Sequence, residues 1–129
     1  MRTNADIIND HYAASARGDI PGMMVDVDRG VRWTEMAGFP YAGTWIGPEQ
    51  VVERVFTRLA TEWIDYRFTL ERLLENGHSV VAIGTYSGTY KQTVKSMRAR
   101  VTHVWRLEQG KVISFEQFTD TLLVARAMS

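Results

Sequence analysis

A histidine lies among large apolar residues in the stretch RVTHVWRLEQGKVISFEQFTD, residues 100–120. Side chains alternate between the two faces of a strand, so His103 shares one face with Val101 and Trp105. An imidazole on such a face is either a core or dimer-interface residue with hydrogen-bonded ring nitrogens, or a working group in a pocket. In a pocket, His103 could donate a hydrogen bond to an oxygen that gains negative charge, and an imidazolium would do so more strongly.

Glu35 is a second residue that could do chemistry, because it shares a face with an aromatic residue. The alternation in VRWTE, residues 31–35, places Trp33 and Glu35 on the same side of a predicted strand. Glu35 is then either a solvated carboxylate at the rim of a pocket or a working acid or base. A carboxyl group beside an aromatic wall has its charged form disfavoured, which raises its pKa toward a useful range. If the sheet curves, a hydrogen bond between Glu35 and His103 is expected.

Asp120 stands at the end of the second strand of the same hairpin. In a regular strand it would share a face with Glu116 and Phe118, opposite Phe115 and Gln117. A bulge near the strand end could turn Asp120 inward. Otherwise it is a capping or interface residue, and the sequence leaves both alternatives open. If Phe115 faces inward, Gln117 adds a polar group to an otherwise apolar wall.

Residues 4–16 predict the first of the helices that must position these groups. Their apolar residues recur at helical spacing, and the buried face includes His11 and Tyr12. His11 could serve the core or a pocket, and Tyr12 could place its hydroxyl at a pocket. Thr3 with Asp6 resembles a capping box at the start of this helix.

Two further helices are expected in the first half of the chain. Asp19, followed by Pro21, predicts a short helix that runs to about Val25. The segment AGFPYAGTW predicts a loop or a short hairpin. Gly47-Pro48 then begins a helix with a one-sided apolar stripe, which consists of Val51, Val52, Val55, Phe56 and Leu59.

After Trp63 the sequence changes to a period of two, which is typical of strands. Asn76-Gly77 predicts a hairpin turn, a strand is expected from about Ser79 to Gly88, and Gln109-Gly110 marks the turn of the last hairpin. This order favours an α+β fold, in which a curved, mostly antiparallel sheet wraps around about three helices. Such a sheet encloses a cone, and the mouth of a cone is a natural pocket for a small molecule.

Aromatic residues are frequent enough to form much of a core and a pocket wall. Those expected there are Trp33, Phe39, Tyr41, Trp45, Trp63, Tyr86, Trp105 and Phe118. A flat or hydrophobic ligand would suit such a wall. The candidate substrate-binding residues are His11, Tyr12, Trp33, Trp105, Phe115 and Gln117.

The composition predicts one ordinary domain over residues 1–129, with 45% apolar residues, 23% charged residues and a net charge of zero. A zero net charge argues against a nucleic-acid partner. There is no cysteine, and the three histidines lack metal-ligand spacing, so no metal site is expected. Neither a signal peptide nor a membrane span is visible, and we expect a cytoplasmic protein without a membrane partner.

Three parts of the chain together resemble a known superfamily. They are HYAASARGDIPGMM with VRWTEM, the helix GPEQVVERVF, and THVWRLEQGKVISFEQFTDT. They are similar to the nuclear-transport-factor-like superfamily, and most similar to its SnoaL-like polyketide cyclases and ketosteroid-isomerase-related proteins. The resemblance covers nearly the whole chain and implies a cone-shaped, cystatin-like α+β barrel.

The resemblance also implies roles for individual residues. The general base of the isomerases lies on the early strand, where this chain has Glu35 in WTEM. A second isomerase acid, which donates to the oxyanion, matches His103 in THVWRL. The isomerase tyrosine on the first helix matches His11, with Tyr12 one residue on. The base of the SnoaL-like cyclases is an aspartate in the last strand, and Asp120 in FEQFTD is its match.

Together these observations lead us to expect a small-molecule enzyme that needs no cofactor. It would act by general acid–base chemistry next to a carbonyl of a hydrophobic substrate, giving isomerization, aldol cyclization or dehydration, with Glu35, His103 and Asp120 as catalytic residues. Because one fold hosts many functions, the alternative is a non-catalytic ligand-binding or dimerization module. The resemblance also implies a homodimer formed through the sheet.

Overall fold

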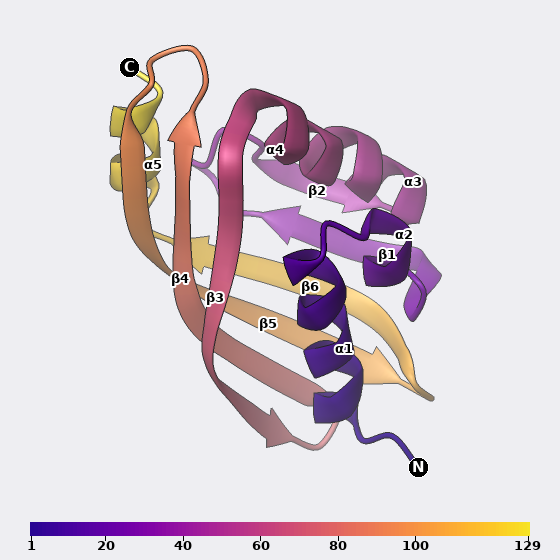
Figure 1. The fold of residues 1–129 in the computed structure, drawn as a ribbon. Coiled ribbons are helices and arrows are strands. Elements are labelled where there is room, and N and C mark those ends of the chain that lie inside the picture. Colours follow the sequence, from indigo (N-terminus) through magenta and orange to yellow (C-terminus); the bar gives the residue numbers. More distant parts are fainter.

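The structure, a computed structural model, describes residues 1–129 and shows a curved, open six-stranded sheet with helices against it (Figure 1). The predicted α+β class is confirmed. The helical segments are α1 (Asn4–Ala16), α2 (Ile20–Met23), α3 (Pro48–Val51), the π-helical turn η1 (Val52–Phe56), α4 (Thr57–Glu62) and α5 (Thr121–Ala127). The strands are β1 (Val27–Glu35), β2 (Gly43–Ile46), β3 (Trp63–Asn76), β4 (Ser79–Tyr90), β5 (Ser96–Glu108) and β6 (Lys111–Thr119). No helix combines the length and apolar character needed to cross a lipid bilayer.

The strands lie side by side in the order β2-β1-β6-β5-β4-β3. From β3 to β6 they form the expected antiparallel meander, whereas β1 pairs in parallel with β6 and in antiparallel with β2. An early strand is therefore the neighbour of the last one. This arrangement brings Glu35, at the end of β1, to the same part of the sheet as the closing hairpin β5–β6.

The alternation expected on the closing hairpin is present. His103 and Trp105 are buried on β5, and Phe115 and Gln117 are buried on β6. Phe118 is 48% exposed and is not the core or wall residue that its aromatic character suggested. The physical reason is that β6 pairs regularly with β5 from Ser114 to Thr119, so Phe118 faces away from Gln117.

The first helix begins and packs as predicted. The Thr3 hydroxyl accepts from the Asp6 amide while the Asp6 carboxylate accepts from the Thr3 amide, which is a capping box. The buried face of α1 includes His11 and Tyr12. Figure 1 shows α1 lying across the sheet, so this face points to the strands. The next helix, α2, ends at Met23 and is shorter than expected.

The helix predicted from Gly47-Pro48 contains one wide turn. The segments α3, η1 and α4 follow one another without a break, and η1 is a π-helical turn with wider hydrogen bonds than an α-helix. Val55 is fully buried, as the apolar stripe predicted. A π turn changes the direction in which side chains point. Phe56 at the end of the turn and Leu59 and Ala60 after it line the cavity described below.

Gly84 on β4 permits a close approach by Phe68 on β3. A Cβ atom at Gly84 would lie 2.4 Å from the Thr69 backbone oxygen and 2.7 Å from Cζ of Phe68. Because protein interiors are close-packed, any larger residue would push the strand or the ring away. Phe68 itself stacks on His103 with ring centroids 4.7 Å apart. The glycine thus lets Phe68 reach its position over the imidazole.

We predict that Gly84→Ala destabilises the protein by about 1–3 kcal/mol, because the added methyl group overpacks the contact between β3 and β4. The measurement is the free energy of unfolding from urea denaturation. Gly30→Ala is the matched control, since its Cβ atom would meet nothing closer than 3.4 Å. Equal losses in the two variants would contradict the role assigned to Gly84.

Candidate functional site

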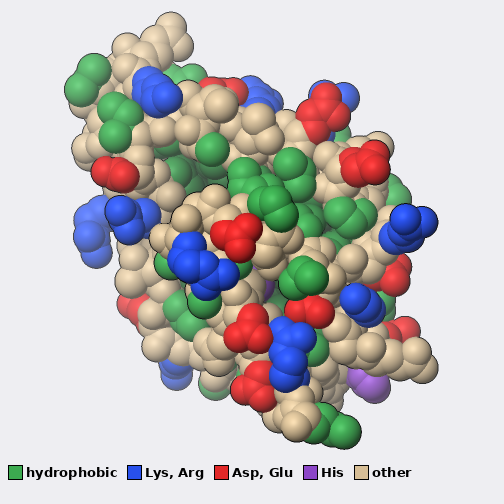
Figure 2. Space-filling view, turned by 45° about the vertical axis from the view of Figure 1, so that its right-hand side comes forward, with side chains coloured by type: hydrophobic (Ala, Val, Ile, Leu, Met, Phe, Trp, Pro, Cys, Tyr) green, Lys and Arg blue, Asp and Glu red, His purple; other side chains and the backbone are tan.

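A cavity of about 220 Å³ lies between α1, the η1–α4 segment and the inner face of the sheet. Residues around its opening are exposed or half-buried: Ser15, Gly18, Leu59, Ala60 and Asp65. Its deeper walls are mostly aromatic and buried. Figure 2 shows hydrophobic side chains gathered near the middle of one face, with charged side chains around them. A pocket of this form suits a small, largely apolar molecule.

His103 lies in the buried part of this cavity, held between two tyrosines. Its Nδ1 is 2.7 Å from the Tyr12 hydroxyl and its Nε2 is 2.7 Å from the Tyr86 hydroxyl. These contacts join β5 to α1 and to β4. Burial, and to a smaller extent the neighbouring His11, lower the pKa of His103 to about 3, so the imidazole is neutral near pH 7.

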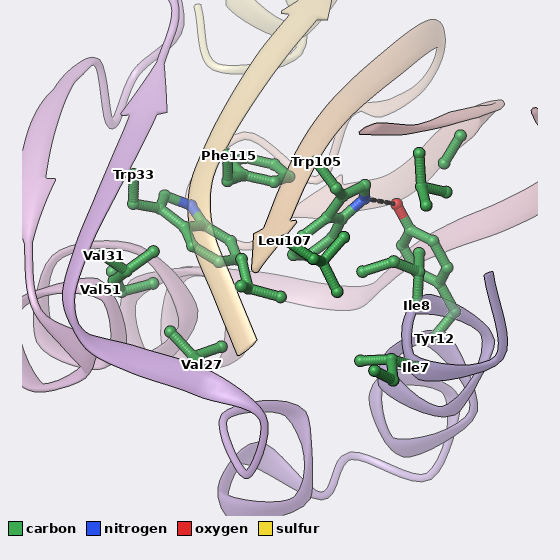
Figure 3. Packing of buried hydrophobic residues seen from close by; sticks show 13 residues of the cluster. Ile7, Ile8, Tyr12, Val27, Val31, Trp33, Val51, Trp105, Leu107 and Phe115 are labelled. Carbon is green, nitrogen blue, oxygen red and sulfur yellow. Dashed lines mark hydrogen bonds between the residues drawn. The ribbon is translucent and has the colours of Figure 1, made fainter. Parts of the chain in front are cut away.

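Besides its bond with His103, each of the two tyrosine hydroxyls accepts a hydrogen bond from a fixed donor. Trp105 Nε1 donates to Tyr12 over 2.9 Å, and Figure 3 shows this bond crossing from β5 to α1. Gln117 Nε2 donates to Tyr86 over 2.9 Å. Gln117 is itself oriented, because its Oε1 accepts from the Met36 amide over 3.3 Å. The hydrogen-bonded chain therefore runs from β6 through β4 and β5 to α1.

Glu35 faces the same cavity with a buried carboxyl group. The residue is 4% exposed, and its Oε2 has no hydrogen-bond partner. Desolvation by burial raises the pKa of Glu35 well above its usual value, because no cation compensates the buried charge. No lysine or arginine lines the cavity, and its other carboxylate, Asp65, stands at the exposed opening. A carboxyl group in this setting keeps its proton to a higher pH than usual and accepts one strongly when ionised.

Two more polar atoms of the cavity walls are buried without a partner. They are the Trp33 indole Nε1 and the Tyr66 hydroxyl. Trp33 also stacks on Phe115 with centroids 4.0 Å apart, a contact between β1 and β6 that Figure 3 displays. Buried polar atoms normally have partners. Unpartnered atoms around one cavity indicate a place where a ligand's polar groups would be bound.

His11 is a neutral cavity residue held by the backbone. Its Nδ1 donates to the carbonyl oxygen of Met23 over 2.9 Å. Burial lowers the pKa of His11 to about 4, although the bond to Met23 acts in the opposite direction. Its ring also meets Trp105 edge-on, with centroids 4.7 Å apart. His11 therefore contributes no positive charge to the cavity near pH 7.

The residues proposed from the sequence separate into three groups. Those that line the cavity are His11, Tyr12, Trp33, Glu35, His103 and Phe115. Trp105 and Gln117 do not line it, but each donates to a tyrosine hydroxyl that does. Asp120 is exposed and outside the cavity.

The position of Asp120 has a local cause. Its carboxylate accepts from the Leu123 amide and caps α5, a helix that the sequence had not indicated. Of the two alternatives for Asp120, capping is the one present. The expected hydrogen bond between Glu35 and His103 is also absent, because both imidazole nitrogens face tyrosine hydroxyls instead.

Sequence reasoning did not single out three residues of the site. Tyr86 was expected only as core or wall, and Tyr66 and Phe68 only as part of an alternating strand. The alternation on β4 does place Tyr86 on the face of the buried Val80 and Ala82, which was a usable signal. The pairing of Tyr86 with His103 requires the register between β4 and β5, which no short motif reveals.

Comparison with solved structures supports this fold over the whole chain. An NTF2-like protein from Burkholderia thailandensis is 53% identical, with a TM-score of 0.97 over 100% of this chain and 99% of that one. An NTF2-like protein of unknown function from Burkholderia pseudomallei is 28% identical, with a TM-score of 0.91 over 100% and 99%. TerC, co-crystallised with polyporic acid, is 23% identical with a TM-score of 0.88 over 97% of each chain. The comparison with curated proteins finds no match.

The family comparison agrees with the fold. Residues 8–115 match the SnoaL-like domain, a span that runs from α1 to β6. It includes the cavity residues from the first helix to Phe115. The chain therefore belongs to the SnoaL-like domain family of the nuclear-transport-factor-like fold.

Proposed function

We propose that this protein is an enzyme that binds a small, hydrophobic, uncharged carbonyl compound and moves a proton at the carbon next to the carbonyl. Glu35 is the general base in the forward step and, once protonated, the acid that returns the proton. Isomerization, aldol cyclization and dehydration all begin with this step.

The observation that carries the proposal is the unpartnered carboxyl oxygen of Glu35 in an aromatic cavity. A carboxyl group kept only for stability would be paired, because an unpaired buried charge is costly. Desolvation raises the pKa of Glu35, and a base with a higher pKa abstracts a weakly acidic proton more effectively. The cost is that a smaller fraction of the protein carries the ionised base near pH 7.

The walls of the cavity support the choice of ligand. They are largely aromatic and carry no lysine or arginine, so an anionic ligand would find no counter-charge. TerC, which shares the fold, was co-crystallised with polyporic acid, in keeping with small-molecule binding by proteins of this shape. An uncharged planar compound with a carbonyl group suits these walls.

Proton abstraction can be tested without knowing the natural substrate. We predict that the protein accelerates exchange of hydrogen for deuterium at C2 of 1-indanone in D₂O, followed by NMR. Glu35→Gln keeps the size of the side chain but removes the base, so the rate enhancement should fall roughly 100- to 10,000-fold.

Glu116→Gln is the matched control, because Glu116 is exposed on the outer face of β6 and should not affect exchange. If Glu35→Gln binds the ketone and exchanges it as fast as the natural protein does, Glu35 is not the base. If the natural protein binds the ketone but gives no exchange with this or related cyclic ketones, the non-catalytic binding module is the better description.

The raised pKa of Glu35 predicts how exchange depends on pH. The base is active only when ionised, so the rate should rise with pH and reach half its maximum well above the ordinary carboxyl value of 4.5. The Glu35→Gln variant should lack this rise. A half-maximum near 4.5 would mean that Glu35 is not desolvated during the reaction.

The same shift predicts an effect on stability with a definite sign. The folded state holds the Glu35 proton more tightly than the unfolded state, so ionisation above the unfolded pKa disfavours folding. Relative to Glu35→Gln, the natural protein should lose stability as the pH rises from about 5 toward the folded pKa, and then level off. Urea denaturation of both proteins gives this difference, in which contributions of His11 and His103 cancel. A difference that does not change with pH would contradict the shift.

A further inference from the structure

The contacts of His103 leave one hydroxyl hydrogen without a partner. The imidazole is neutral and so carries one N–H, while Tyr12 and Tyr86 each carry one O–H, which makes three hydrogens. Only two hydrogen bonds link these groups, one at each ring nitrogen. One hydrogen is left over, and it must belong to a tyrosine because both imidazole nitrogens are engaged.

The tautomer of His103 determines which tyrosine holds the spare hydrogen. If Nδ1 is protonated, it donates to Tyr12, and the Tyr86 hydroxyl donates to Nε2. The spare hydrogen is then on Tyr12. If Nε2 is protonated, it donates to Tyr86, and the Tyr12 hydroxyl donates to Nδ1, so the spare hydrogen is on Tyr86.

No protein group receives this hydrogen. The other bond of Tyr12 comes from the Trp105 indole, and the other bond of Tyr86 comes from the Gln117 amide; both are donors. Both tyrosines are buried and line the cavity. A buried hydroxyl donor without an acceptor is unfavourable, so an acceptor atom is expected from the contents of the cavity.

We propose that the tyrosine pair binds a carbonyl or enolate oxygen of the ligand through this spare hydroxyl, and that His103 is a positioning residue whose tautomer sets which tyrosine donates. His103 thus acts through Tyr12 or Tyr86 and does not touch the ligand oxygen. The assignment deepens the proposed function, on which it rests for the nature of the ligand. It supplies the hydrogen-bond donor that an enolate formed at Glu35 needs.

In this site a change in the tautomer of His103 is easier than a movement of its imidazole ring. Phe68 stacks on the imidazole with planes 21° apart, and the Phe115 ring lies 4.8 Å away between centroids. The ring is therefore confined, whereas a change of tautomer moves no heavy atom of the protein. Hydrogens shift along the two short bonds, and the spare hydrogen passes from one tyrosine oxygen to the other through solvent in the cavity, so that each oxygen keeps one hydrogen. A ligand oxygen placed nearer to one tyrosine can select the matching tautomer without repacking the core.

The relay is tested first in the unliganded protein by the ¹⁵N chemical shifts of His103. Tyr12→Phe leaves Nδ1 without a partner, and an unpaired lone pair is less unfavourable than an unpaired N–H, so the proton should lie on Nε2. Tyr86→Phe should place it on Nδ1 for the same reason. The same tautomer in both variants, or an imidazolium at pH 7, would overturn the relay.

Ligand binding is tested with 1-indanone labelled with ¹³C at the carbonyl, and with indane as a probe of the same shape without an acceptor. In the natural protein, the bound carbonyl resonance should move downfield as expected for a hydrogen-bonded ketone, and 1-indanone should bind up to about tenfold more tightly than indane after correction for transfer from water. A carbonyl resonance like that in an apolar solvent would overturn the proposal.

The double variant Tyr12→Phe/Tyr86→Phe should lose both the downfield shift and the preference for the ketone. If both persist, another donor such as Trp33 or Tyr66 binds the oxygen, and the proposal is wrong. If this variant does not fold, the two single variants and the natural protein still decide the matter.

The two proposals can fail separately. Glu35→Gln should keep the downfield carbonyl resonance while it loses hydrogen exchange. Hydrogen bonding without exchange in the natural protein would reject the catalytic role of Glu35 and leave the tyrosine pair intact. Hydrogen exchange without a downfield carbonyl resonance would support Glu35 as the base and reject the tyrosine pair as the donor.

Discussion

The two hydrogen bonds of His103 connect parts of the chain that are far apart in sequence. Tyr12 comes from α1, Tyr86 from β4 and the imidazole from β5, and Gln117 extends the connection to β6. A neutral imidazole can be buried here only because both of its nitrogens are satisfied. This arrangement ties α1 to the sheet and fixes the orientation of both hydroxyls at the cavity floor.

Glu35 differs from this network in having no compensation of its own. The polar groups around His103 form a nearly complete set of bonds, whereas the Glu35 carboxyl is left with an unpartnered oxygen. The cavity therefore has hydrogen-bonded polar groups around His103 and an unpartnered carboxyl oxygen at Glu35. Proteins retain unsatisfied buried groups where chemistry or binding requires them, and their positions help to locate a site.

The sequence predicts a site residue well when a local pattern sets its position, and poorly when distant parts of the chain do. Alternation along one strand was enough to place His103 and Gln117 on the buried face, and the capping box was visible as a local pattern. The partners of His103 depend on strand register and on helix docking, which are set by packing across the whole core. Asp120 was ambiguous for a related reason, because whether a strand ends in a bulge or a helix cap depends on the residues that follow.

The apolar stripe of the helix that begins at Pro48 was predicted correctly, but the wide turn within that helix was not. Val55 is buried as its spacing indicated, yet the π turn at η1 is not encoded in any simple periodicity. Propensity scales describe average helices and do not distinguish a single wide turn. The residues that follow the turn form part of the cavity wall, so this missing detail matters more for the site than for the fold.

The parallel pairing of β1 with β6 has a consequence for the order in which the molecule assembles. The Met36 amide and the Gln117 side chain that meet at this junction are 81 positions apart, whereas the hairpins of the meander form between near neighbours. Contacts of long sequence separation close large loops and tend to form after local ones. Glu35 therefore reaches the cavity only when the sheet is nearly complete. During folding, the Glu35 carboxyl group would be the last of these groups to reach the cavity, after the hairpins that bear His103 and Tyr86 have formed.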